Sequence, residues 1–169
     1  MDYWDFIDSA HDNLGREFDD IDLSANMVIL ALNRASSAIT YDLESSVHRS
    51  EGGSWSSYRF LFVLWHAGPV SAHELARLTN MTRTAVSNMS HSLIGRDLIE
   101  KQPSAADGRS VTLSLTATGR EFIRELFRLQ NVREGEWASS LSGIEQELLI
   151  MLLRKLMTGE GVAHLRVRS

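Results

Sequence analysis

The chain contains no cysteine, which excludes disulfides and thiolate metal sites. It also has no apolar run near the roughly 18 residues that a membrane span needs. The first residues, Met1 to Asp5, are acidic and lack the basic start of a secretory signal peptide. Together these absences predict a cytoplasmic protein that does not associate with membranes. An apolar content of 43% is sufficient for a packed core, in one domain or in one domain with a dimerisation appendage.

The usual motifs of catalysis are missing as well. The six histidines and the many carboxylates form no HExxH pair, and the sequence has neither a glycine-rich phosphate loop nor a nucleophile elbow. The pair His73-Glu74 is explained by its position in a helix cap. We therefore expect no enzyme, no metal site and no cofactor.

Negative charge is concentrated at the N-terminus. Residues 1–22 hold eight Asp and Glu and one Arg, whereas residues 23–169 hold 16 basic and 14 acidic residues. The formal net charge of −5 therefore does not exclude nucleic-acid binding, because the location of charge matters more than its total. Such binding must depend on a few well-placed arginines and should weaken as the salt concentration rises.

Hydrophobic periodicity predicts a mainly α-helical fold with a small β-hairpin. Helices are expected over residues 3–18, 23–48, 56–67, 72–78, 83–95 and 117–139, and from about 143 to about 157. Two strands, 99–103 and 110–115, enclose a short loop, and residues 159–169 are expected to fray.

Short polar residues mark the beginnings of the two central helices. Ser71 and Glu74 have the spacing of a capping box, in which the Ser71 hydroxyl accepts from the Glu74 amide and the Glu74 carboxylate reaches back. Asn80 lies in the turn that follows, and Thr82 caps helix 83–95. The pattern is that of a helix-turn-helix.

Helix 83–95 has an apolar face and a polar face. The apolar positions are Val86, Met89, Leu93 and Ile94. The polar positions are Thr82, Arg83, Thr84, Ser87, Asn88 and His91. A recognition helix needs this division, because one face packs and the other contacts base edges and phosphates in the major groove. The alternative is an ordinary helix with a solvated polar face.

The hairpin after this helix, which we call the wing, carries Asp107-Gly108-Arg109 in its loop. Arg109 can reach into a narrow minor groove, and Asp107 can brace its side chain. The alternative is a solvated turn in which Asp107 and Gly108 supply turn geometry only. Helix and wing in this order favour a winged helix-turn-helix over either alternative.

These features resemble the MarR family of transcriptional regulators over most of the chain, from about residue 24 to about residue 158. The residues that carry the resemblance are Leu75-Ala76, Thr84-Ala85-Val86-Ser87, Leu93, Leu98-Ile99, Asp107-Gly108-Arg109 and the run from Val111 to Gly119. The most specific part is the Asp-x-Arg wing that continues into the start of the next helix.

The resemblance implies a homodimer that reads a palindromic operator, most simply as a repressor. It assigns DNA contacts to Arg83, Thr84, Ser87, Asn88 and Arg109, with Asp107 orienting Arg109. It divides the chain into an acidic N-terminal extension (1–22), an N-terminal dimerisation helix (23–54), a winged lobe (55–116) and C-terminal dimerisation helices (117–169). The role of the extension does not follow from the resemblance.

Many relatives in this family leave DNA when they bind a phenolic or aromatic acid or its coenzyme A thioester, and others sense oxidants through cysteine. The absence of cysteine excludes the second mechanism here. The candidate effector residues are Arg34, Tyr41, Trp55, Tyr58, Arg59, Phe62 and His66. A small molecule held between the dimerisation helices and the winged lobe would act by favouring one spacing of the two recognition helices.

Each effector candidate has a structural alternative. Trp55, Tyr58, Phe62 and His66 follow helical spacing and can be core packing, with His66 a satisfied buried histidine. Arg34 can pair with an effector carboxylate or with an acid of segment 1–22. That segment can pack across a dimer or cover the pocket. The alternative for the whole protein is a winged helix that only binds other proteins.

Overall fold

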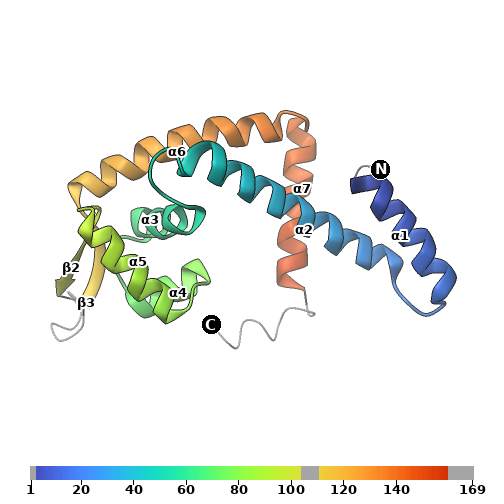
Figure 1. The fold of residues 1–169 in the computed structure, drawn as a ribbon, viewed down its shortest axis with the longest axis horizontal. Helices are drawn as coiled ribbons and strands as arrows, with labels where there is room; N and C mark the ends of the chain where they lie inside the picture. The colour runs from blue at the N-terminus through green and yellow to red at the C-terminus, as the bar shows by residue number, and fades with distance from the viewer. Residues whose placement is uncertain (1–2, 104–110, 160–169) are drawn as a thin grey trace. The chain divides into compact units, whose positions relative to one another are not determined.

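The structure, a computed structural model, describes residues 3–103 and 111–159 (Figure 1). The chain divides into two compact units, Met1–Asp42 and Leu43–Ser169. None of the described helices is both long and apolar enough to cross a membrane. The predicted class is confirmed, because helices dominate and a small antiparallel sheet accompanies them.

The first unit consists of two helices. Helix α1 (Tyr3–Glu17) matches the amphipathic pattern, and its Ile7 is buried. Helix α2 (Leu23–Leu43) begins after a short turn, where the Asp22 carboxylate accepts a hydrogen bond of 2.8 Å from the amide of Ala25. This is the side-chain capping that a helix N-terminus requires.

The predicted helix 23–48 changes its winding near its end. Residues Glu44–His48 form a π-helical turn, η1, in which the amide of Arg49 donates to the carbonyl of Glu44 over 3.0 Å. The spacing of hydrophobic residues does not reveal this change from α-helix to π-helix. Over a single turn, both helix types place the same residues on roughly the same side.

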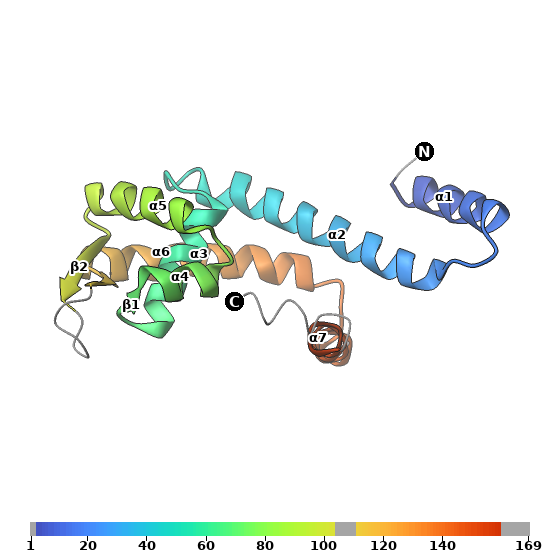
Figure 2. The same ribbon diagram turned by 90° about the horizontal axis from the view of Figure 1, so that it is seen from below.

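The second unit continues with a helical lobe and a sheet. Its elements are α3 (Trp55–Ala67), β1 (Val70–Ser71), α4 (Ala72–Thr79), α5 (Arg83–Gly95), β2 (Ile99–Pro103), β3 (Val111–Leu115), α6 (Ala117–Ala138) and α7 (Gly143–Thr158). Helices α4 and α5 and the sheet gather near the start of α6 (Figure 2). The predicted boundaries agree within one or two residues.

The sheet has three antiparallel strands in the order β1-β3-β2. In the hairpin, Ile99 pairs with Leu115 and Lys101 with Leu113. The short strand β1, which the sequence pattern did not predict, adds Ser71 opposite Thr112. Ser71 is both the last residue of β1 and the N-cap of α4, so the sheet and the helix-turn-helix are joined without a loop.

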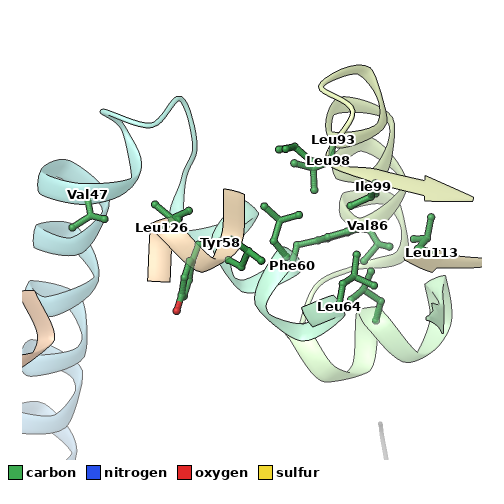
Figure 3. Packing of buried hydrophobic residues seen from close by; sticks show 13 residues of the cluster. Val47, Tyr58, Phe60, Leu64, Val86, Leu93, Leu98, Ile99, Leu113 and Leu126 are labelled. Atoms are coloured by element: carbon green, nitrogen blue, oxygen red, sulfur yellow. The ribbon is translucent and has the colours of Figure 1, made fainter. Parts of the chain in front are cut away.

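The core of this unit lies between α3, α5, the sheet and α6 (Figure 3). Phe60 and Leu64 of α3 meet Val86 and Leu93 of α5, and all four side chains are buried. Burial of such side chains stabilises a fold by about 1.5–3 kcal/mol each. The core therefore holds α5 by one face and leaves the other face free.

Candidate nucleic-acid interface

The helix-turn-helix begins with an exposed cap at α4. The Ser71 hydroxyl accepts from the amide of Glu74 over 3.2 Å, as predicted. The Glu74 carboxylate does not reach back, however; it accepts two hydrogen bonds of 2.6 and 3.1 Å from Arg77. A charge-assisted pair one turn along the helix is the stronger partner for a carboxylate. The Arg77 guanidinium accordingly holds the pKa of Glu74 below its usual value.

The turn between the two helices is set by backbone geometry. Asn80 adopts a left-handed conformation with φ of 54°, which asparagine tolerates better than most residues. The Thr82 hydroxyl then accepts from the amide of Ala85 over 3.1 Å and caps α5. Both predictions for this turn are confirmed, and they fix where α5 begins.

The polar face of α5 is open to solvent. Thr82, Arg83, Thr84, Ser87, Asn88 and His91 are all exposed. On the opposite face Val86 and Leu93 are buried, and the buried Ser90 hydroxyl is satisfied by the carbonyl of Val86 at 2.7 Å. Ile94 lies at the margin of this face and is 36% exposed, so its predicted place in the core is wrong. It is followed at once by Gly95, where the helix leaves the core.

The end of α5 is tied to the turn before α3. Arg96 donates to the carbonyl of Gly52 over 2.9 Å, and its guanidinium lies 5.3 Å from the centre of the Phe122 ring. Asp107 and Arg109, the predicted wing contacts, lie outside the described residues. The two strands that carry them are present as predicted, apart from the first residue of the second strand, 110, which also lies outside.

A cavity of about 280 Å³ lies between α5 and the sheet. Its lining combines the polar face of α5 with residues of α4 and of both wing strands. The lining residues are Ala72, Arg83, Ser87, Ser90, His91, Lys101, Val111 and Leu113. Lys101 was missed in the sequence analysis; it is exposed and shares one face of β2 with the buried Ile99.

The aromatic candidates on α3 form a continuous series of ring contacts. Trp55 stacks on Tyr58 with ring centres 5.7 Å apart, Tyr58 meets Phe62 at 5.6 Å, and Phe62 meets His66 at 4.4 Å. Tyr58 is buried in the core, and burial raises the pKa of its phenol. His66 is exposed at the other end of the series, so the buried-histidine alternative for it is wrong.

The remaining effector candidates lie elsewhere on the chain. Arg59 is half-buried on α3. Arg34 and Tyr41 belong to the first unit, where the Arg34 guanidinium lies 4.6 Å from the centre of the Tyr3 ring and Tyr41 is exposed. Arg34 therefore contacts segment 1–22 through a cation–π interaction with Tyr3, whereas its pairing with an acid of that segment stays a prediction.

Next to the aromatic series the structure contains a buried histidine that the sequence analysis did not single out. The ring of His48 is fully buried 4.9 Å from the ring of Tyr58. Among the described residues neither of its nitrogens has a hydrogen-bond partner, and the same holds for the side-chain oxygen of the buried Gln130. Burial lowers the pKa of His48, against the opposing charges of Glu44 and Glu134. Within residues 3–103 and 111–159 no three acidic or histidine side chains are grouped for a metal ion.

The chain is similar in sequence to known transcriptional regulators. The sequence profile of the MarR family matches residues 54–111. The uncharacterised regulator YwaE of Bacillus subtilis is 26% identical over 86% of this chain and 88% of its own length. The transcriptional repressor MprA of Escherichia coli is 32% identical over 53% of this chain and 51% of its own length.

Solved structures share the fold. A MarR-family transcriptional regulator from Silicibacter pomeroyi aligns over 80% of this chain and 90% of that chain, with a TM-score of 0.72 and 23% identity. BpsR of Bordetella bronchiseptica, described in terms of regulation of its DNA binding by 6-hydroxynicotinic acid, aligns over 79% and 94% with a TM-score of 0.69 and 22% identity.

Proposed function

This chain is a member of the MarR family of transcriptional regulators, and we propose that it binds a palindromic operator as a homodimer and releases it on binding an aromatic acid. The observation that carries the proposal is the capped helix α5, whose six predicted contact residues are exposed while its other face is buried. Arg83 stands in the first turn of α5, where a guanidinium can form two hydrogen bonds to a guanine edge.

Dimerisation is supported by α7, because none of its residues is buried although it is rich in apolar side chains. Ile144 is 79% exposed and Met157 63% exposed. A folded protein rarely leaves an apolar surface of this extent in water, and a second copy of the helix would cover it. A dimer also supplies the two recognition helices that a palindrome needs.

A repressor role is supported by similarity to MprA, which is a transcriptional repressor. The proposed effector is an aromatic acid or its coenzyme A thioester, in keeping with the ligand of BpsR and with the aromatic series on α3. Core packing explains Tyr58 equally well, whereas the exposed end of the series at His66 favours a ligand. We propose that segment 1–22 either packs across the dimer or covers the effector-binding pocket.

The test uses DNA that the wild-type protein selects from a random duplex library. Arg83→Ala and Arg109→Ala should each weaken binding to the selected duplex about tenfold or more, because each removes a charged contact. Arg128→Ala, which removes a guanidinium paired with Glu125 on α6, serves as the control. If neither variant binds more weakly than the control while all remain folded, the protein-interaction alternative is correct.

A further inference from the structure

Lys101 lies at an exposed position of strand β2, two residues beyond the buried Ile99. It pairs directly with Leu113, and its neighbour two residues earlier, Ile99, is buried in the core. Side chains at alternate positions of a strand share one face, so Lys101 extends from the face that packs toward α5. The side chain is exposed, so its ammonium group is accessible to an anion that enters the cavity from solvent.

Within residues 3–103 and 111–159 this group has no acidic partner. Among the described residues Lys101, Arg83 and His91 form no hydrogen bond or ion pair, although all three line the cavity between α5 and the sheet. Other arginines of the same unit are paired, as in Arg77–Glu74 and Arg124–Glu121. The cavity therefore brings together two cationic side chains, Arg83 and Lys101, that have no ion-pair partner among the described residues.

The nearest acid along the strand is directed elsewhere. Glu100 alternates with Lys101, so its carboxylate lies on the other face of the sheet. There it accepts a hydrogen bond of 2.7 Å from Gln102, and the Ser114 hydroxyl lies 3.5 Å away. The Glu100 carboxylate therefore lies on the opposite side of the sheet from the cavity.

We propose that this cavity receives a phosphodiester group of the DNA backbone and that Lys101 is the positioning residue that holds it. The proposal rests on the proposed function, since it concerns the same DNA-binding face. The volume of about 280 Å³ exceeds the roughly 30 Å³ of one water molecule several times over. A phosphate bound by Lys101 of β2, together with a base contact of Arg83 on α5, fixes the helix and the wing on one stretch of DNA. The phosphate contact sets the register of the protein on DNA without reading bases.

The experiment compares Lys101→Gln with Arg124→Gln, which removes the same charge from α6 away from the cavity. The full chain is titrated with a labelled duplex of mixed sequence over a range of KCl concentrations. Lys101→Gln should bind roughly tenfold more weakly at low salt, and the slope of log K against log salt should fall by about one for each phosphate that the variant no longer neutralises. The base preference, measured by selection from a random library, should not change.

Two results overturn the inference. The first is that Lys101→Gln and Arg124→Gln have equal affinities and equal salt slopes. The second is that benzoate raises the melting temperature of the wild type but not of Lys101→Gln while DNA affinity is unchanged, which would make the cavity a site for a free carboxylate. Failure of the wild type to bind any duplex would instead overturn the proposed function, so the two failures are distinguishable.

Discussion

The carbonyl of Leu98 lies against Gly119: a Cβ atom on Gly119 would stand 1.8 Å from the Leu98 oxygen. This close approach joins the segment between α5 and β2 to the first turn of α6. The amide of Thr116 donates to the same carbonyl over 3.2 Å, and the Thr116 hydroxyl caps the helix at Gly119. Glycine is required here because the backbones approach too closely for any side chain.

Gly119→Ala should therefore destabilise the protein by about 2–4 kcal/mol, since backbone on both sides must shift. Gly135→Ala in the same helix is the control, because its Cβ would meet nothing within 4 Å and alanine favours a helix by about 1 kcal/mol. Urea unfolding of both variants provides the measurement. Equal midpoints for the two variants would show that the close approach does not constrain the fold.

Acid should destabilise the protein through His48. Because burial lowers its pKa in the folded state, the unfolded chain takes up a proton first as the pH falls. The contribution of His48 to stability is complete above the ordinary histidine pKa of about 6.5 and is lost as the pH falls from there toward the lowered value. The carboxylates of Glu44 and Glu134 face His48 and oppose this lowering of its pKa, but burial has the larger effect. The Tyr58 phenol, whose own pKa is raised by burial, remains neutral.

The measurement is the unfolding midpoint in urea at about pH 7 and at about pH 5. His48→Phe keeps an aromatic ring beside Tyr58 and removes the titration, so it should lose less stability between these pH values than the wild type does. His48→Gln gives a second non-titrating variant if phenylalanine packs poorly. An identical pH dependence in all three proteins would assign acid sensitivity to other groups.

The exposed apolar surface of α7 predicts how the dimer can be broken. Leu148 and Leu152 lie one turn apart and each is about half exposed, so Leu148→Arg with Leu152→Arg places two charges in the proposed interface. The double variant should be monomeric in light scattering and should bind the selected duplex at least tenfold more weakly, because each bound protein then presents one recognition helix instead of two. Glu147→Arg, on the same helix, is the control. A dimeric double variant would place the interface elsewhere.

A thermal-shift screen of aromatic acids and their coenzyme A thioesters tests the effector. A ligand that binds the folded protein raises its melting temperature, and at 100 times its Kd the gain is about 2.7 kcal/mol. Arg59→Ala should reduce the shift given by a free acid, since a guanidinium beside the aromatic series can pair with a carboxylate. Tm values unchanged by every compound would favour the core-packing alternative for the aromatic series.

The parts of the fold predicted most accurately are those with strong local signals. Helix α5 begins after the Thr82 cap and ends at Gly95 as expected, because capping and periodicity agree there. Strand β1 was missed because two residues show no alternation, and the π turn was missed because side-chain spacing hardly differs from that of an α-helix. Glu74 was assigned to the wrong partner because Arg77 lies equally close in sequence.

The site was less predictable than the fold. The exposed face of α5 follows from helical geometry and is confirmed, whereas the roles of its residues remain proposals. Lys101 and His48 were missed because their surroundings depend on the packing of distant segments. Lys101 lines a cavity with residues of α5, and His48 packs on rings from α3.

The direct junction at Ser71 bears on how this protein tolerates insertions and deletions. One inserted residue between Val70 and Ala72 would exchange the two faces of β1 against β3 and displace the cap of α4 at the same time. Pro103 and Val111, the paired ends of the two wing strands, have no such double role, because neither caps a helix. Among related chains, length changes should therefore be absent at Ser71, so that the spacing between the sheet and the helix-turn-helix persists.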